Sequence, residues 1–253
     1  MDDGFFVPAL HDGMGAFPGP RGTTILVRNH EISPLDTRLG PWGWTNERLP
    51  RVDPKKIYDQ GGSCPLLGGC TTLIYDTAKR ELVQHALSLT GTVQNCAGGT
   101  TPWGTWISCE ESEIQVDDDH RVDHGYAFEV PATQTMGLAD PRPLREMGRF
   151  RREAVAVDAA SGIVYQTEDI GDGLFYRFIP KTRGVLGDGG RLQALAIVDR
   201  SSCDLRNWPA EEGEVMTPRI SVGASMAVRW IDLDEVESPN SDLRHRGFSD
   251  GAA

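Results

Sequence analysis

Acidic side chains follow three apolar segments of this chain directly, at the points where predicted strands end. They are Glu31, Glu110, Glu111, Glu168 and Asp169. If equivalent strand ends point at one axis, these carboxylates repel one another, and burying each of them without a partner costs several kcal/mol. Hard cations remove that cost, and Ca²⁺ prefers carboxylate oxygens. The repetition therefore favours a shared cation site over the alternative, in which each acid is a solvated loop residue.

The segment from Asn95 to Trp106 has the most unusual composition in the chain. It reads Asn-Cys-Ala-Gly-Gly-Thr-Thr-Pro-Trp-Gly-Thr-Trp. Cys96 precedes an expected turn at Gly98 and Gly99, where the backbone can approach a ligand closely because glycine has no side chain. A thiolate among carboxylates indicates a transition metal beside the hard cations, since sulfur prefers softer ions than Ca²⁺. The alternative is a small buried cysteine that packs as a hydrophobic residue.

Two further groups of residues are candidates for binding. The loop at residues 169–174 places two acids among glycines, next to Glu168, and is a candidate cation site. Arg28, Arg152 and Arg177 are candidates for an anionic substrate, because a guanidinium binds phosphate through two hydrogen bonds. Arg177 alternates with aromatic residues and can equally face solvent.

Composition excludes several classes of function. The 253-residue chain has 25 Lys and Arg against 37 Asp and Glu, a net charge of −12 with histidine neutral. Nucleic acid and anionic membranes repel such a chain. No apolar run approaches the roughly 18 residues of a membrane span, and no export signal is visible near the N-terminus. Serine-triad and nucleotide-dependent mechanisms lack support, because their motifs are missing.

Short runs rich in Val, Ile, Thr, Tyr and Phe alternate with Gly and Pro, which predicts an all-β protein made of hairpins. The predicted strands are 23–27, 71–75, 81–89, 105–109, 125–130, 154–157, 163–167, 174–179, 192–198 and 226–233. Helix formers occur only at residues 233–237, before Pro239, which cannot continue a helix.

These strands repeat along the chain. Residues 71–78 resemble residues 153–160, and each forms a strand followed by a turn that begins with Asp. An Asp at this position bonds its own backbone, and Gly162 supplies the positive φ of a short hairpin loop. Repeats near 40 residues with about four strands each are typical of β-propeller blades. An ordinary β-sandwich with similar hairpins is the alternative.

The number of predicted strands is too small for a closed ring of blades. About ten to twelve strands make about three blades, whereas propellers close with four to eight. We therefore expect either a small propeller with unrecognised strands or an incomplete propeller, a piece of a larger one.

Four separated motifs resemble those of the PhoX family of alkaline phosphatases. In chain order they are Arg28-Asn-His-Glu31, Asn95-Cys-Ala-Gly-Gly-Thr-Thr-Pro-Trp-Gly-Thr-Trp-Ile-Ser-Cys-Glu-Glu111, Gly148-Arg-Phe-Arg-Arg-Glu-Ala-Val-Ala-Val-Asp158, and Val164-Tyr-Gln-Thr-Glu-Asp169 with Leu174-Phe-Tyr-Arg-Phe178. The similarity is specific because the motifs occur in the family's order, from about Thr23 to the C-terminus.

This resemblance implies a six-bladed β-propeller that hydrolyses small phosphomonoesters. Its central site would hold two ferric ions and calcium ions, bridged by an oxo group. The iron-binding cysteine would be Cys96, and the acidic metal ligands would lie among Glu31, Glu110, Glu111, Glu153, Glu168 and Asp169. We expect the catalytic centre at Cys96, Glu31, Glu110 and Glu168. Family members are typically exported through the twin-arginine route, so the resemblance implies a periplasmic or extracellular protein.

The chain also departs from the family pattern. Family chains are longer at both ends, so residues 1–253 are expected to form one propeller domain truncated at both ends, without the later blades and their ligands. Arg152 stands where many relatives carry His.

Three functions remain open at this point. The first is a metal-dependent phosphomonoester hydrolase, which needs no protein nucleophile because several cations stabilise the charge on the phosphoryl oxygens. The second is a calcium-dependent propeller lactonase or esterase, which would need neither iron nor Cys96. The third is a non-catalytic propeller module in which cations only hold the blades together.

Overall fold

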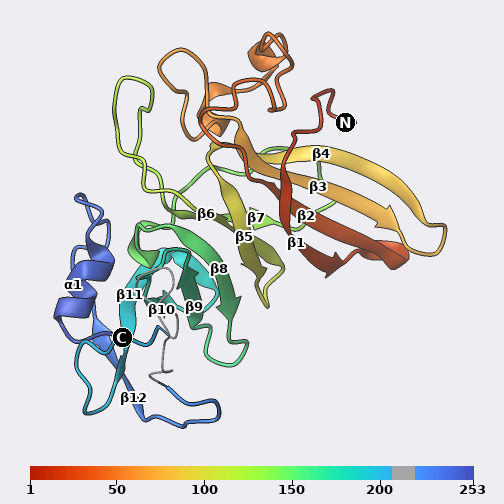
Figure 1. The fold of residues 1–253 in the computed structure, drawn as a ribbon. Coiled ribbons are helices and arrows are strands. Elements are labelled where there is room, and N and C mark those ends of the chain that lie inside the picture. The colour runs from red at the N-terminus through yellow and green to blue at the C-terminus, as the bar shows by residue number, and fades with distance from the viewer. Residues whose placement is uncertain (207–219) are drawn as a thin grey trace.

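The computed structural model describes residues 1–206 and 220–253, and this part of the chain folds into three antiparallel sheets (Figure 1). The first sheet has the order β1 (His11–Pro18), β2 (Thr23–His30), β3 (Gly68–Asp76), β4 (Glu81–Thr92). The second has the order β5 (Asn95–Thr100), β6 (Thr105–Glu110), β7 (Ala127–Pro131). The third has the order β12 (Val228–Asp232), β11 (Val185–Ile197), β10 (Phe175–Thr182), β9 (Val164–Glu168), β8 (Arg152–Val157). None of these sheets closes into a barrel, and the all-β prediction is confirmed.

All ten predicted strands are present, and the described residues contain two more, β1 and β5. Both additional strands are rich in glycine, so they lack the β-branched and aromatic residues by which strands are recognised. The turn expected at Gly98 and Gly99 is wrong, because these residues pair with Ser108 and Ile107 inside the second sheet.

Residues 233–237, where the sequence offers helix formers, are not helical in the structure. The Arg149 side chain donates from Nε to the carbonyl of Glu237 at 2.8 Å and from Nη2 to that of Ser238 at 2.6 Å. These two hydrogen bonds tie the segment after Leu233 to the buried Arg149 side chain in a non-helical conformation. The α-helix lies later, as α1 (Leu243–Ser249). Short 3-10 turns occur at η1 (Pro20–Gly22), η2 (Leu49–Arg51), η3 (Pro54–Lys56) and η4 (Arg145–Met147).

The two repeated hairpin turns form as predicted. The Asp76 carboxylate accepts hydrogen bonds from the backbone N–H groups of Ala78 and Lys79. The Asp158 carboxylate does the same for the two backbone N–H groups at equivalent positions. Gly162 closes the second turn with a φ of 78°, in the region that favours glycine.

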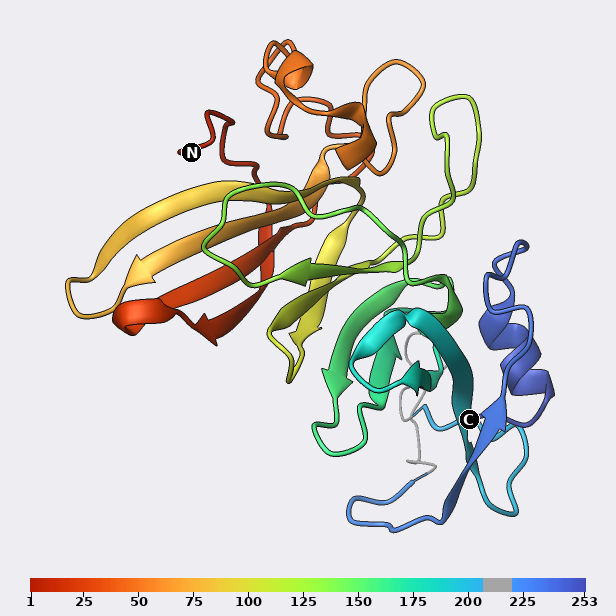
Figure 2. The same cartoon turned by 180° about the vertical axis from the view of Figure 1, so that it is seen from behind.

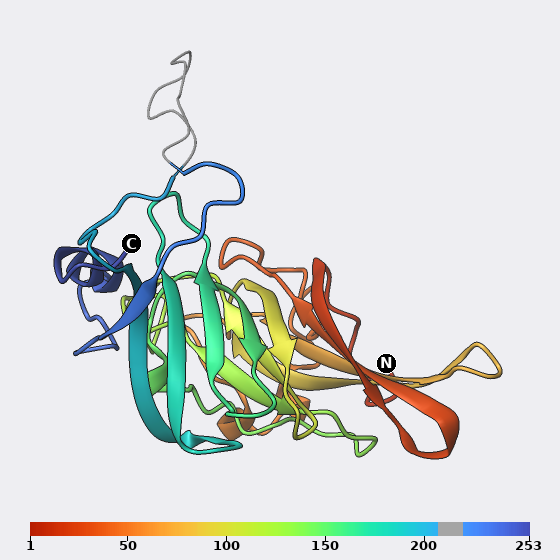
Figure 3. The same ribbon diagram turned by 90° about the horizontal axis from the view of Figure 1, so that it is seen from below.

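The first strands of the three sheets, β1, β5 and β8, lie side by side (Figures 1 and 3). Glycines make this approach possible. A Cβ on Gly13 of β1 would stand 2.7 Å from Cα of Ala97, and a Cβ on Gly99 of β5 would stand 2.2 Å from the carbonyl oxygen of Val155 in β8. Because both obstacles are backbone atoms, no side-chain rotation could relieve the clash. The three strands therefore converge only as long as these residues are glycines.

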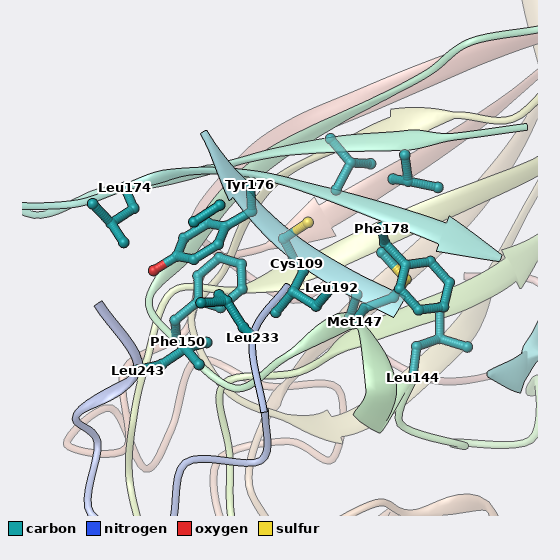
Figure 4. Close-up of a cluster of buried hydrophobic side chains, with 14 of the residues drawn as sticks. Cys109, Leu144, Met147, Phe150, Leu174, Tyr176, Phe178, Leu192, Leu233 and Leu243 are labelled. Atoms are coloured by element: carbon teal, nitrogen blue, oxygen red, sulfur yellow. The ribbon is translucent and has the colours of Figure 1, made fainter. Parts of the chain in front are cut away.

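The described residues form three apolar cores, one of which, around Trp42 and Ile57, packs the loops that precede β3. The other two lie beside the sheets. One lies between the first and second sheets and is built around residues such as Val27, Leu89 and Phe128. The other joins the second and third sheets to the C-terminal segment, and Figure 4 shows it. Its rings of Phe150 and Tyr176 stack with centroids 4.5 Å apart. Cys109, fully buried in this core, is a packing residue, as expected for a thiol inside a strand.

Helix α1 packs beside the third sheet, on the side away from the first sheet (Figures 1 and 2). Leu243 anchors it in the core next to Leu174 and Leu233. No helix in the described part of the chain is long and apolar enough to cross a membrane.

Gly99→Ala is expected to destabilise the fold, because the added methyl group must displace the β8 backbone. We expect a loss of about 2 kcal/mol in the free energy of unfolding, the usual scale for overpacking. Urea unfolding of purified variants measures it. Gly171→Ala is the matched control, since its Cβ would meet no atom within 4 Å, and we expect its stability to stay within about 0.5 kcal/mol of wild type. Equal stability of both variants would contradict the close approach of β5 and β8.

Candidate metal centre

Four carboxylates and one thiol meet where β1, β5 and β8 lie side by side. They form two groups that share Cys96, one with Asp12 and Glu31 and one with Glu111 and Glu153. Within each group, the potential ligand atoms lie within 4.8 Å of one another. The Cys96 thiol lies 3.3 Å from both carboxylate oxygens of Glu153 and donates its hydrogen there. The arrangement therefore offers one sulfur at the centre of several carboxylate oxygens.

The same strand position supplies a ligand in each of the three sheets. Asp12, Cys96 and Glu153 are each the second residue of the first strand of their sheet. At each of them the pairing with the second strand shifts by one residue, as in a β-bulge. A bulge leaves the extra residue unpaired and re-aims its side chain. Three equivalent bulges therefore direct three side chains toward one place.

A second set of acids comes from the residue that directly follows the second strand of each sheet. Glu31, Glu111 and Asp169 directly follow β2, β6 and β9. Glu31 and Glu111 belong to the two groups around Cys96. Burial, together with repulsion from Glu111 and Asp169, raises the pKa of Glu153. The acids one residue earlier, Glu110 and Glu168, end the strands themselves. Since successive side chains along a strand point to opposite faces, they belong to a different face from their neighbours.

Glu110 is buried and fully engaged within the protein. Its carboxylate accepts hydrogen bonds from the backbone N–H groups of Val93, Gly125 and Tyr126 and from Nδ1 of His124 at 2.7 Å. It is not part of either cluster among the described residues. In this arrangement Glu110 links the second sheet to the loop that leads into β7.

Glu168 faces a different environment, at a cavity of about 640 Å³ beside α1. One carboxylate oxygen accepts from the Leu174 N–H and the Tyr176 hydroxyl, and the other lies 3.9 Å from Nη1 of Arg244. Burial raises the pKa of Glu168 to about 7. Asp172, in the loop considered for a cation, binds Arg244 through Oδ1 at 3.1 Å.

The buried Asn29 amide positions Cys96. Its Nδ2 donates to the carbonyls of Cys96 at 2.9 Å and Ala97 at 2.8 Å. Its Oδ1 accepts from Trp106 Nε1 and Ser108 Oγ, both at 2.9 Å. One side chain from β2 thus fixes the backbone of β5 at the candidate sulfur ligand and ties it to β6.

The acids of the cluster destabilise one another's charged forms. Burial, together with repulsion from Asp12, Glu111 and Glu153, raises the pKa of Glu31. Burial and the neighbouring Glu153 carboxylate raise the pKa of the Cys96 thiol. A bound cation would relieve this repulsion, and the donor set of carboxylate oxygens and one sulfur fits hard cations together with a softer transition metal.

The three arginines proposed from the sequence for anion binding do not reach this cluster. Arg152 is fully buried, donates to Gln166 and to three backbone carbonyls, and has its guanidinium over the Phe150 ring, so the proposal for it is wrong. Arg28 contacts side chains of β3 and β4. Arg177 donates to a glutamine of β11 and lies over the ring of Trp230.

The chain matches the sequence model of a known protein family. The family described as alkaline phosphatase PhoX matches residues 71–251, which is more than half of the sequence. The chain belongs to the PhoX family. No curated protein and no solved structure matches it. The resemblance expected from the motifs is thus confirmed at the level of the family.

The PhoX match covers Cys96, Glu111 and Glu153, whereas Asp12 and Glu31 lie before it. Sequence reasoning missed Asp12, because the strand that carries it has few apolar residues. A weak signal exists in retrospect. Asp12 directly precedes Gly13, and Cys96 lies two residues before Gly98; both glycines make close backbone contacts in this PhoX chain.

Asn29→Asp is expected to destabilise the protein by about 3 kcal/mol, since it replaces the donating amide by an acceptor that faces two carbonyls in a buried site. Thermal or urea unfolding at neutral pH measures the loss. Asn240→Asp makes the same chemical change at an exposed residue and should leave stability nearly unchanged. Wild-type stability of Asn29→Asp would show that the amide does not hold β5.

Stability is expected to fall as the pH rises from about 6.5 to about 9, because His124 is charged in the fold. Burial opposes this charge, but Glu110 and Asp59 outweigh burial and raise the pKa of His124 to about 9, against 6.5 for a free histidine. The stabilisation is complete below the lower value and lost through the upper one. Urea unfolding at pH 6 and 9.5 tests this. His124→Gln should flatten the difference, and an equally steep fall in that variant would assign it to other groups.

Proposed function

We propose that this PhoX-family protein is a metal-dependent phosphomonoester hydrolase. The observation that carries the proposal is the convergence of Asp12, Glu31, Glu111 and Glu153 on Cys96, in a chain that belongs to an alkaline phosphatase family. Carboxylates in this density are suited to hold several cations. The substrate that we propose is a small phosphomonoester, in keeping with the family.

The proposed metals are ferric iron and calcium. Cys96 would hold the iron, since a thiolate favours a softer ion than calcium, and the surrounding carboxylates would hold calcium as well as the remaining iron positions. We keep Asp169 among the proposed ligands because it follows β9 as Glu111 follows β6. Glu110 and Glu168 are weaker candidates than the sequence suggested, since their carboxylates serve other contacts.

Bound cations would supply positive charge for the phosphoryl oxygens and the leaving alkoxide, and would lower the pKa of water. The chain's own residues would orient these cations. The strands β1, β5 and β8 provide a rigid frame, and Asn29 fixes the sulfur ligand on it. A protein nucleophile is not needed for such a reaction.

We also propose that the three sheets are blades of a single β-propeller domain, six-bladed in the family, which residues 1–253 form in part. Supporting this, the first strands of successive sheets lie together and carry the candidate ligands, as the inner strands of blades would. A periplasmic or extracellular location is proposed from the family alone.

Elemental analysis of protein purified without chelators tests which metals are bound. The Cys96→Ser variant tests whether Cys96 is the iron ligand. We expect iron and calcium in the wild type, a visible absorption band from the iron–sulfur bond, and phosphomonoesterase activity. In Cys96→Ser we expect the band to vanish, and iron and activity to fall together while calcium stays. Serine keeps the size of the side chain but binds iron more weakly.

Cys64→Ser is the matched control, because Cys64 is also partly buried but bonds Asn46 rather than the cluster. It should keep iron, colour and rate. Calcium without iron in the wild type would favour a calcium-dependent lactonase or esterase, or a non-catalytic module. A Cys96→Ser protein that keeps its iron and its rate would show that Cys96 is only a packing residue.

A further inference from the structure

A cavity of about 270 Å³ lies between the first sheet and the loop that follows β7. β3 and β4 line one side of it, with Thr72, Ala86 and Ser88. Val130 and residues of the segment 131–139 line the other side. In the first sheet, β4 is the edge strand opposite β1. Since the candidate metal centre lies at β1, the cavity is a separate site.

Hydrogen bonds near both ends hold the loop over the first sheet. Near its start, Nε2 of Gln84 in β4 donates to the carbonyl of Gln134 at 3.0 Å. At its end, the N–H of Ala139 donates to the carbonyl of Ser88 at 2.9 Å. Ser88 is the extra residue of a bulge in β4, which leaves it outside the regular pairing with β3. Figure 2 shows the loop crossing the first sheet, so the cavity is covered on this side by an anchored segment.

The chemistry of the lining selects an uncharged ligand. All of the described residues that line the cavity are uncharged, and most are apolar, such as Ala86, Val130 and Leu138. Thr72 and Ser88 are buried, and their hydroxyl oxygens have no hydrogen-bond partner among the described residues. Burying a hydroxyl without a partner costs free energy, and a hydroxyl group of a ligand would remove that cost. The lining therefore suits a molecule with an apolar body and one hydroxyl group.

We propose that this cavity binds a small uncharged alcohol with an aromatic or branched apolar body. Close-packed proteins contain few voids larger than a water molecule, and an apolar cavity of about 150 Å³ accommodates benzene. The volume of about 270 Å³ therefore leaves room for one ring and a hydroxyl group. The apolar side chains contact the ring, and Thr72 and Ser88 bond the hydroxyl group. This inference does not depend on the proposed hydrolase function.

Calorimetry of the metal-loaded full chain with benzyl alcohol tests the proposal. We expect a dissociation constant below about 1 mM, the scale that a ligand of this size reaches in a matching cavity. Benzoate has the same ring with a negative charge. It should not displace benzyl alcohol, because no described residue in the lining offsets that charge.

Thr72→Val removes a hydroxyl from the lining and keeps the branched shape of the side chain. We expect the affinity for benzyl alcohol to fall about fivefold, the scale of one neutral hydrogen bond. Without ligand, we expect Tm to rise by about 2 °C, because the variant buries one unpartnered hydroxyl less. Thr90→Val is the matched control, since the Thr90 hydroxyl is also buried without a partner among the described residues but Thr90 does not line the cavity. It should show the same rise in Tm and wild-type affinity.

Ala86→Leu places a larger side chain in the cavity and should abolish binding of benzyl alcohol. If this variant does not fold, Thr72→Val decides the question. The proposal is overturned if the wild type binds no benzyl alcohol at about 10 mM, a concentration well above the expected dissociation constant. It is equally overturned if Thr72→Val and a folded Ala86→Leu protein both keep wild-type affinity, because the alcohol then binds elsewhere. None of these outcomes bears on phosphomonoester hydrolysis at the metal centre.

Discussion

A single buried amide holds together the part of the molecule on which the candidate site depends. Asn29 lies in β2 of the first sheet. Its side chain forms hydrogen bonds with the backbone of β5 and with side chains of β6, so these bonds connect the first sheet to the second. A polar group buried in this way is stable only when its donors and acceptors are matched, as they are here. These hydrogen bonds therefore tie the backbone at Cys96 to β2, the strand that Glu31 directly follows.

The acids around Cys96 destabilise the folded state, whereas the hydrogen bonds of Asn29 stabilise it. Burial and mutual repulsion raise the pKa of Glu31 and of Glu153. Among residues 1–206 and 220–253, Arg151 is the one cationic side chain that forms an ion pair with an acid of the cluster. Such a site has a clear thermodynamic consequence. Ligands that bind the folded chain and not the unfolded chain stabilise it by mass action, so cations at this cluster would contribute both to the proposed chemistry and to folding.

The internal repeat puts an acidic pair at the end of two of the second strands, but comparing the repeated segments does not show which acid of each pair joins the cluster. Acidic pairs end the second strands, and the sequence alone gives no reason to prefer Glu110 over Glu111 or Glu168 over Asp169. In the fold, Glu110 accepts four hydrogen bonds around His124, and its neighbour Glu111 joins the cluster. A shift of one residue reverses the face of a strand to which a side chain belongs, so this choice depends on pairing that only the sheet defines.

The sequence by itself determined the all-β class, ten of the strands, the two Asp turns and the family, because these depend on local patterns of apolar, turn-forming and motif residues. It also named Cys96, Glu31, Glu111 and Glu153 as candidate ligands, but it did not separate them from Glu110, Glu168 and Asp169. Only the tertiary structure decided that Asp12 joins them, that Arg152 is sealed in the core, and that Arg151 faces the site. The physical reason is that glycine-rich strands β1 and β5 carry little local signal, and their position depends on close backbone contacts between distant segments.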